Sequence, residues 1–279
     1  MKINGGRVSL GIDEAGYGPI LGPLCISCFA SNQDYQGPIA DSKMLHKRKT
    51  LDPLIQKCQE YMPSFDPELP NKNDVQNQEL SEQTNNEPWL GAFADLSYQQ
   101  NSPADPAHFL SIEVMGVENF NQKVESGLNK AEVLIGLMQK TFEPVINQCL
   151  KADKIELTID RLGGRKSYGE VLAKWGFLIR DGIETQKKSS YEGSYKGCPC
   201  EVSFNVKGDQ NYHHIAAASC FSKLSRELAM AQFNHWWTTR IPNLKPTAGY
   251  FTDGKKFLKN IEFFCAENKI PLTTLLRII

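Results

Sequence analysis

The stretch Leu10-Gly11-Ile12-Asp13-Glu14-Ala15-Gly16-Tyr17-Gly18-Pro19 indicates both how this sequence folds and where its chemistry lies. Apolar residues occupy every second position of 8–12, the period of a β-strand with one buried face. This period places Asp13 on the face away from the core. Glu14 would point the opposite way on a continuing strand, so both carboxylates can serve one site only if the backbone turns at Gly16. A solvated strand end is the alternative for the acid pair taken alone.

Length and composition limit the class of protein. The 279 residues suffice for one large domain, or for one domain with elaborations. No apolar run approaches the roughly 18 residues of a membrane span, and the first residues lack the apolar core of a signal peptide. We therefore expect a cytoplasmic protein without membrane contact.

The eight cysteines do not follow the spacing of a zinc site. Cys25 and Cys28 lie in an apolar, strand-like run, where side chains three positions apart point to opposite faces. Cys198-Pro199-Cys200 has no second pair at zinc-finger spacing. The sequence therefore predicts reduced, partly buried thiols.

The net charge of −1 conceals a segregation of charge. Nine acidic residues and one lysine occupy 60–105, so this stretch carries −8 and the rest of the chain +7. Residues 62–106 also contain six of the 15 prolines, which is typical of a surface insertion with at most short ordered pieces around 89–93. We expect this insertion to contribute little to the core, and the basic body to suit a polyanionic partner.

Hydrophobic periodicity predicts an α/β fold, a mixed sheet flanked by helices. Strands are expected at 7–13, 20–30, 109–114, 155–159, 177–180 and 201–207. Helices are expected at about 43–61, 117–124, 131–150, 167–175, 212–239 and 254–268. No structure is assigned to 187–200.

A second motif, Ala40-Asp41-Ser42-Lys43-Met44-Leu45, stands where a helix is expected to begin. Helix amides together with the Lys43 ammonium suit a phosphate group. Simple capping of the helix by Ser42 is the alternative.

Two further acids follow predicted strands. Asp160 ends its strand on the polar face, as Asp13 does, and Asp209 stands in Lys207-Gly208-Asp209 before the long helix. On that helix a hydroxyl and two cations recur at i, i+4 and i+7 and share one face, at Ser219, Lys223 and Arg226. Such a face could follow a phosphate backbone, although a cationic stripe by itself is more often solvated.

Taken together, these motifs resemble a type 2 ribonuclease H, the ribonuclease HII family. The matching segments are Asp13-Glu14-Ala15-Gly16-x-Gly18-Pro19, Asp41-Ser42-Lys43-x-Leu45, Ile159-Asp160, Lys207-Gly208-Asp209 with Ala216-Ala217-Ala218-Ser219 and Lys223-x-x-Arg226, and Gly249-Tyr250-Phe251-Thr252-Asp253. Their order and spacing agree across residues 8–258. Each segment is weak alone, and five in order are a strong signal.

The resemblance implies one ribonuclease H-like catalytic domain over 1–279, interrupted by the acidic insertion at about 62–106. It also implies catalytic acids that bind Mg²⁺ or Mn²⁺, namely Asp13, Glu14, Asp160 and Asp209. Phosphodiester hydrolysis makes the same demand, since two cations roughly 3.5–4 Å apart provide a hydroxide and stabilise the leaving oxygen. Oxygen ligands favour these metals over zinc. His213 and His214 have no counterpart in the motifs, and we interpret them as helix-start residues.

The implied activity is endonucleolytic hydrolysis of the RNA strand of RNA–DNA hybrids by a monomer, with ribonucleotides embedded in DNA duplexes as a further substrate class. The family senses a ribose 2′-hydroxyl through its glycine-x-glycine backbone and a stacked tyrosine. The substrate-binding residues expected here are Gly16, Tyr17, Gly18, Lys43, Ser219, Lys223, Arg226 and Tyr250. This sequence departs at Tyr17, where the family usually has arginine, because a phenol cannot make a bidentate phosphate contact.

Two other classes of protein are alternatives. A nucleotide-binding Rossmann enzyme is disfavoured, because Pro19 and the next glycine at Gly22 break the G-x-G-x-x-G spacing. A catalytically weak or silent hybrid-binding protein stays open, because Tyr17 and the insertion mark a divergent sequence. Four intact acids favour the enzyme.

Overall fold

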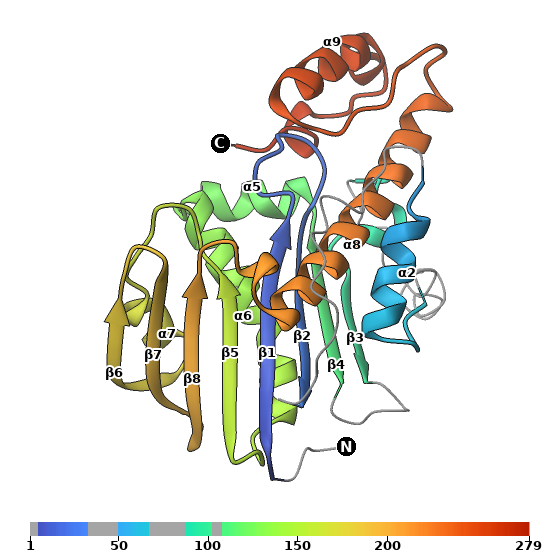
Figure 1. Cartoon of the computed structure of the whole chain (residues 1–279). Coiled ribbons are helices and arrows are strands. Elements are labelled where there is room, and N and C mark those ends of the chain that lie inside the picture. Colours follow the sequence, from blue (N-terminus) through green and yellow to red (C-terminus); the bar gives the residue numbers. More distant parts are fainter. Residues whose placement is uncertain (1–4, 33–49, 67–86, 102–107, 279) are drawn as a thin grey trace.

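An eight-stranded mixed sheet organises the chain (Figure 1). The computed structural model describes residues 5–32, 50–66, 87–101 and 108–278. The strands, in their order across the sheet, are β3 (Ser97–Asn101), β4 (Phe109–Met115), β2 (Leu24–Asn32), β1 (Arg7–Ala15), β5 (Lys154–Asp160), β8 (Cys198–Asn205), β7 (Lys188–Tyr195) and β6 (Phe177–Glu184). The predicted α/β architecture is confirmed.

The three central strands run parallel, and this brings their carboxyl ends to one edge. β5 pairs in parallel with β1 on one side and with β8 on the other, whereas the remaining pairs are antiparallel. Ile12 pairs with Ile159, and Asp160 pairs with Asn205. Asp13 and Asp160 therefore follow neighbouring positions on adjacent strands.

Helices cover both faces of the sheet (Figure 1). One face packs against α5 (Val117–Glu125), α6 (Lys130–Gln148) and α7 (Gly169–Lys174), and the other against α2 (Asp52–Tyr61) and α8 (His213–Thr238). The far half of α8 packs against α9 (Phe251–Glu267), beyond the edge where β1 ends. Short 3₁₀ turns are η2 (Gly91–Phe93), η3 (Gly208–Gln210) and η4 (Leu272–Thr274).

Helix α8 crosses β1 at Gly11 with no room for a side chain. A Cβ on Gly11 would lie 2.1 Å from the carbonyl carbon of His214. Further along, Ser222 Oγ donates a 2.8 Å hydrogen bond to the backbone oxygen of Asp13. Asp13 does lie on the face of β1 opposite Val8, Leu10 and Ile12, as expected. The expectation that this face is left uncovered is wrong, because α8 packs on it and Asp13 is only 8% exposed.

Most predicted elements are present, but β3 and β7 were not predicted and one strand begins later than expected. The strand expected at 20–30 begins at Leu24, because Ile20 and Leu21 instead donate backbone hydrogen bonds to Gly249. The segment 187–200 contains β7 and the start of β8. The buried positions of β7 are serine, tyrosine, glycine and tyrosine. This alternation is only weakly hydrophobic, so the sequence did not predict the strand. The first part of the helix expected at 43–61 lies outside the described residues, and α2 begins at Asp52.

The acidic insertion differs most from its prediction. Trp89 is 1% exposed and packs against Trp236 and Trp237 on α8, with ring centroids 5.7 and 5.6 Å apart. Leu90 joins the same apolar cluster, and β3 forms the edge of the sheet. The expectation of little core contribution is thus wrong for 87–101, because aromatic residues outweigh the acidic composition there. Residues 67–86 lie outside the described part.

The cysteines are free thiols, as predicted, but they are buried almost completely rather than partly. All eight are buried as free thiols, and Cys25 and Cys28 belong to apolar clusters on opposite faces of the sheet. Within the ranges that the structure describes, no helix has both the length and the apolar character needed to cross a membrane.

Candidate active site

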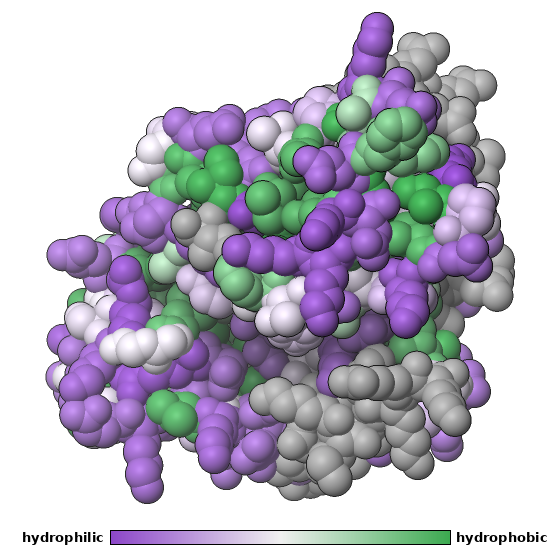
Figure 2. Space-filling view, turned by 90° about the horizontal axis from the view of Figure 1, so that it is seen from above, coloured by the Kyte–Doolittle hydropathy of each residue, from purple (hydrophilic) through white to green (hydrophobic). Residues whose placement is uncertain are grey.

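One pocket at the carboxyl ends of the parallel strands gathers the predicted site residues. Its volume is about 430 Å³. The predicted residues that line it are Asp13, Glu14, Gly16, Tyr17, Gly18, Asp160, Asp209, Ser219, Lys223, Arg226 and Tyr250. Lys43 lies outside the described residues. Figure 2 looks onto this end of the molecule, where polar side chains cover much of the surface.

The first two acids come from the end of β1. Asp13 Oδ1 accepts a 2.8 Å hydrogen bond from the backbone N–H of Glu14. Gly16 has a φ of +95°, a left-handed conformation that favours glycine, and it turns the chain back. The backbone N–H of Tyr17 then donates to Glu14 Oε2 at 3.2 Å. The turn thus directs both carboxylates into the same pocket.

The other two acids are tied together through a backbone amide. Asp160 Oδ1 accepts a 2.7 Å hydrogen bond from the N–H of Gly208, the residue before Asp209. Asp209 is buried in the short η3 turn between β8 and α8. The end of β5 therefore fixes the segment that carries Asp209.

Burial and like charge make the acid cluster electrostatically costly. Burial, and then repulsion from Asp160 and Glu14, raise the pKa of Asp13 well above its usual range. Burial also raises the pKa of Glu14, although hydrogen bonding to Tyr17 and the charges of Arg277 and Arg226 oppose that shift. A cation placed among these groups would relieve the repulsion.

The donor chemistry fits a hard divalent cation. Four carboxylates, from β1, β5 and the turn after β8, line one pocket, and carboxylate oxygens are the ligands that magnesium and manganese prefer. Across the described ranges, no three or more His, Cys, Asp or Glu side chains stand in an arrangement that could already hold a metal ion. The fit therefore rests on the donor types and their shared pocket.

Cationic and aromatic side chains flank the acids. Arg226 on α8 is buried, and its Nη2 donates a 3.1 Å hydrogen bond to the backbone oxygen of Ala248. Tyr250, by contrast, is 59% exposed at the rim. Lys223, Arg226 and Tyr250 also line a neighbouring groove that continues along α8. The site thus opens onto a longer surface.

Tyr17 has two environments. Its ring packs at the edge of the main apolar cluster, and the Nζ atom of Lys130 lies 4.5 Å from the ring centroid. It nevertheless lines the pocket of the four acids. Lys130 begins α6 and belongs to none of the sequence motifs, so sequence analysis did not select it.

His213 and His214 begin α8, as predicted. His214 Nε2 lies 2.8 Å from Ser31 Oγ, and burial lowers the pKa of His214 to about 4. A neutral, buried imidazole held by a hydroxyl is a packing residue, and neither histidine lines the pocket of the acids.

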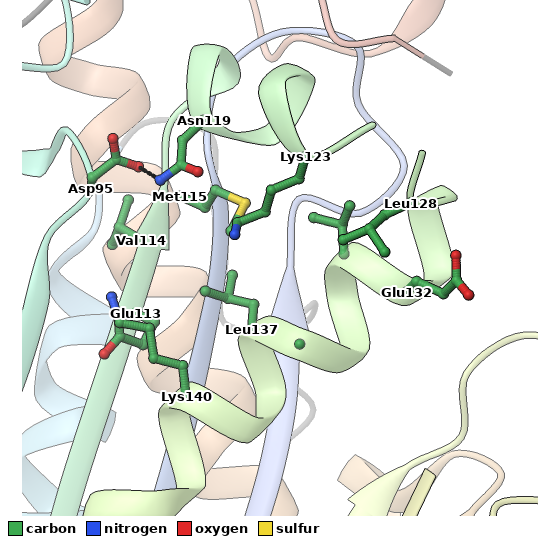
Figure 3. Close-up of a pocket in the computed structure, with 12 residues that line it drawn as sticks. Asp95, Glu113, Val114, Met115, Asn119, Lys123, Leu128, Glu132, Leu137 and Lys140 are labelled. Carbon is green, nitrogen blue, oxygen red and sulfur yellow. Dashed lines mark hydrogen bonds and ion pairs between the residues drawn. The ribbon is translucent and has the colours of Figure 1, made fainter. Parts of the chain in front are cut away.

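A second pocket, of about 320 Å³, lies between β4, α5 and α6 (Figure 3). Its acids are paired within the fold: Glu113 lies 2.7 Å from Lys140 Nζ, and Asp95 accepts hydrogen bonds from Asn119 and from the N–H of Gly116. This pocket therefore lacks the repelling carboxylates of the first, and we assign the candidate chemistry to the pocket at the strand ends.

Sequence comparison matches the N-terminal part of the chain to a known family. A family model described as ribonuclease HII matches residues 10–89. Over 72 residues the chain is 36% identical to a ribonuclease HII from Thermoplasma volcanium, a match that spans 24% of this chain and only 34% of that relative. Asp13 and Glu14 lie inside residues 10–89, which the family model matches, whereas Asp160, Asp209 and Tyr250 lie beyond that range.

Comparison with solved structures covers nearly the whole chain. Ribonuclease HII from Archaeoglobus fulgidus, in its complex with PCNA, aligns over 97% of this chain and 94% of its own, with a TM-score of 0.52 and 14% identity. A mutant protein of Bst ribonuclease HIII aligns over 98% and 67%, with a TM-score of 0.55 and 16% identity. The manganese complex of Bst ribonuclease HIII gives 0.50 at 17% identity. The ribonuclease H-like fold is thereby confirmed.

The electrostatic cost at Asp13 gives a testable prediction. Because the folded-state pKa is raised, ionisation of this carboxyl opposes folding increasingly as pH rises from about 4 toward the folded-state pKa. We expect Asp13→Asn, which keeps the acceptor for the Glu14 amide, to increase the free energy of unfolding at pH 7 and to change it less at pH 4. Urea unfolding in EDTA, at pH 4 and pH 7, measures this.

Asp181→Asn is the control, because Asp181 is exposed on β6. We expect little change in that variant. A destabilised Asp13→Asn protein would show that the carboxylate serves the fold as a structural acceptor.

Proposed function

We propose that this relative of ribonuclease HII is a metal-dependent endonuclease that hydrolyses the RNA strand of RNA–DNA hybrids. The observation that carries the proposal is the meeting of Asp13, Glu14, Asp160 and Asp209 in one pocket beside buried and exposed cations. A structural ion-pair network would balance these acids internally, whereas burial and mutual repulsion raise the pKa of Asp13. We further propose that the chain forms a single catalytic domain.

The four acids would hold the metal. Bound magnesium or manganese would supply a hydroxide nucleophile at neutral pH and stabilise the leaving 3′ oxygen. The manganese complex of Bst ribonuclease HIII, which shares the fold, supports manganese as one usable ion. The protein contributes by holding the carboxylates from separate strands close together in one pocket.

The face of α8 beside the acids would bind phosphates. Ser219, Lys223 and Arg226 all line the pocket, so the shared helix face inferred from their spacing is directed at the acids. Arg226 Nε is buried and has no hydrogen-bond partner among the described residues. A buried donor without a partner is costly, and a phosphate oxygen would satisfy it.

Recognition of ribose would fall to the turn and to Tyr250. The backbone of 16–18 lines the pocket, and the exposed ring of Tyr250 stands at its rim. A base stacked on an aromatic ring contributes about 1–3 kcal/mol of binding free energy. Peptide groups of the turn could reach a 2′-hydroxyl, the group that distinguishes RNA from DNA.

Tyr17 favours a second candidate, a hybrid-binding protein with weak or no turnover. A phenol offers one donor and no charge where a guanidinium would grip phosphate. Loss of that grip would also weaken any preference for a single ribonucleotide embedded in DNA. The two candidates share the fold and the binding surface, so only catalysis separates them.

Cleavage assays on defined duplexes test the proposed function. With magnesium or manganese we expect hydrolysis of the RNA strand of an RNA–DNA hybrid, none of DNA alone, and none in EDTA. Asp209→Asn should abolish cleavage while largely retaining hybrid binding, because it removes a metal ligand and leaves the cationic face intact. A duplex with one embedded ribonucleotide distinguishes the two substrate classes.

Asp181→Asn again serves as the matched control and should cleave normally. Full turnover by Asp209→Asn would refute the metal assignment. Tight hybrid binding without cleavage by the unmodified protein, with either metal, would favour the second candidate.

Tyr17→Arg tests whether position 17 meets the phosphate backbone. If it does, the new guanidinium should tighten hybrid binding and steepen the dependence of log K on log salt by about one unit, since one more phosphate is neutralised. Tyr17→Phe is the control, because it keeps the ring beneath Lys130. An unchanged salt slope in a folded Tyr17→Arg protein would assign Tyr17 to packing alone.

A further inference from the structure

Arg277 lies buried behind the glycine turn that carries the first two acids. Its side chain donates hydrogen bonds to the backbone oxygens of Gly16 and Gly22, with Nε 3.0 Å from the oxygen of Gly22. The guanidinium also lies 5.3 Å from the ring centroid of Phe120. Although burial lowers its pKa to about 9, Arg277 remains cationic at neutral pH. The charged guanidinium of Arg277 thus links the carbonyl groups of Gly16 and Gly22 in the loop after β1.

The segment around Arg277 is held in place independently of its side chain. Its backbone N–H donates to Ile20 at 2.9 Å, and Leu276 forms an antiparallel bridge with Leu21. The amide of Asn121 donates to the oxygens of Thr273 and Leu276 at 2.7 and 2.8 Å. Residues 273–278 therefore form a fixed support for the guanidinium.

The hydrogen bond from Arg277 connects to the candidate site through a single peptide group. The oxygen of Gly16 and the N–H of Tyr17 belong to the same planar unit. Arg277 holds that oxygen, and the N–H donates to Glu14 Oε2 at 3.2 Å. Arg277 therefore fixes the orientation of this peptide through its oxygen, and the orientation determines where the peptide N–H meets the Glu14 carboxylate.

Position 16 does not accept a residue with a side chain. A Cβ there would lie 2.6 Å from both Arg226 Nε and the oxygen of Pro23, and its positive φ disfavours side chains. Rotation of the Gly16 peptide therefore depends on the groups around it. Among the residues that the structure describes, Arg277 donates a hydrogen bond to its oxygen.

We propose that Arg277 is a positioning residue for ribose recognition: its hydrogen bonds to Gly16 and Gly22 orient the 16–18 backbone and, through the shared peptide, the carboxylate of Glu14. The inference rests on the proposed function, in which that backbone meets the 2′-hydroxyl. Nothing in the five sequence motifs includes Arg277. Its role follows from contacts between residues far apart in the sequence.

The test compares binding of an RNA–DNA hybrid with binding of the same sequence as DNA duplex, in EDTA so that nothing is cleaved. We expect Arg277→Met to reduce the preference for the hybrid by about tenfold, the size expected for one charged hydrogen bond, while the affinity for DNA duplex is unchanged. Arg277→Lys should fall between Arg277→Met and the unmodified protein, because an ammonium can bond one carbonyl but cannot span both.

Arg7→Met is the control for loss of charge, since Arg7 is exposed at the opposite end of β1. Thermal unfolding defines a temperature at which every variant is folded. If Arg277→Met does not fold, Asn121→Ala loosens the same segment with the guanidinium present and should lower the hybrid preference in the same direction.

Equal losses of hybrid and DNA affinity, or an unchanged preference in the folded variants, would overturn the role of Arg277. An unmodified protein without hybrid preference would instead overturn the proposed function, and the inference with it. Binding by the unmodified protein therefore tests the proposed function first, and binding by the variants then tests the role of Arg277.

Discussion

The close approach of α8 to β1 at Gly11 is the constraint on which the arrangement of the site depends. With no space for a Cβ at this crossing, the helix lies directly on the strand, and Ser222 bonds the backbone of Asp13. The phosphate-binding face proposed for α8 is thereby placed beside the acids. A larger residue at position 11 would move the helix and separate the cations from the carboxylates.

The parallel order of β1, β5 and β8 supplies the other half of the site. Strand ends collect Asp13 and Asp160 at one edge, and the amide of Gly208 ties Asp209 to Asp160. The cost of this convergence is a raised pKa at Asp13. Residues that destabilise the fold by their proximity are expected where function, not stability, selects them.

Hydrophobic patterns within single segments correctly predicted individual strands and helices. Alternation identified β1 and β5, and periodicity identified α6 and α8, because each buries a continuous face. The covering of Asp13 by α8, the burial of Trp89 and the strand β7 depend on partners elsewhere in the sheet, which alternation within one segment does not contain. Arg277 lies 261 positions from Gly16, and no motif spacing connects them. That the four acids share one pocket was predictable from the sequence, whereas the contacts that support their loop were not.

The central claim is that these four carboxylates form a metal centre. Anomalous scattering from crystals grown with Mn²⁺ tests it most directly. The account predicts manganese peaks among Asp13, Glu14, Asp160 and Asp209, and their loss when Asp209 is replaced by asparagine. Manganese bound only elsewhere, such as near Glu113 in the pocket of Figure 3, or an identical peak in the Asp209→Asn crystals, would contradict it.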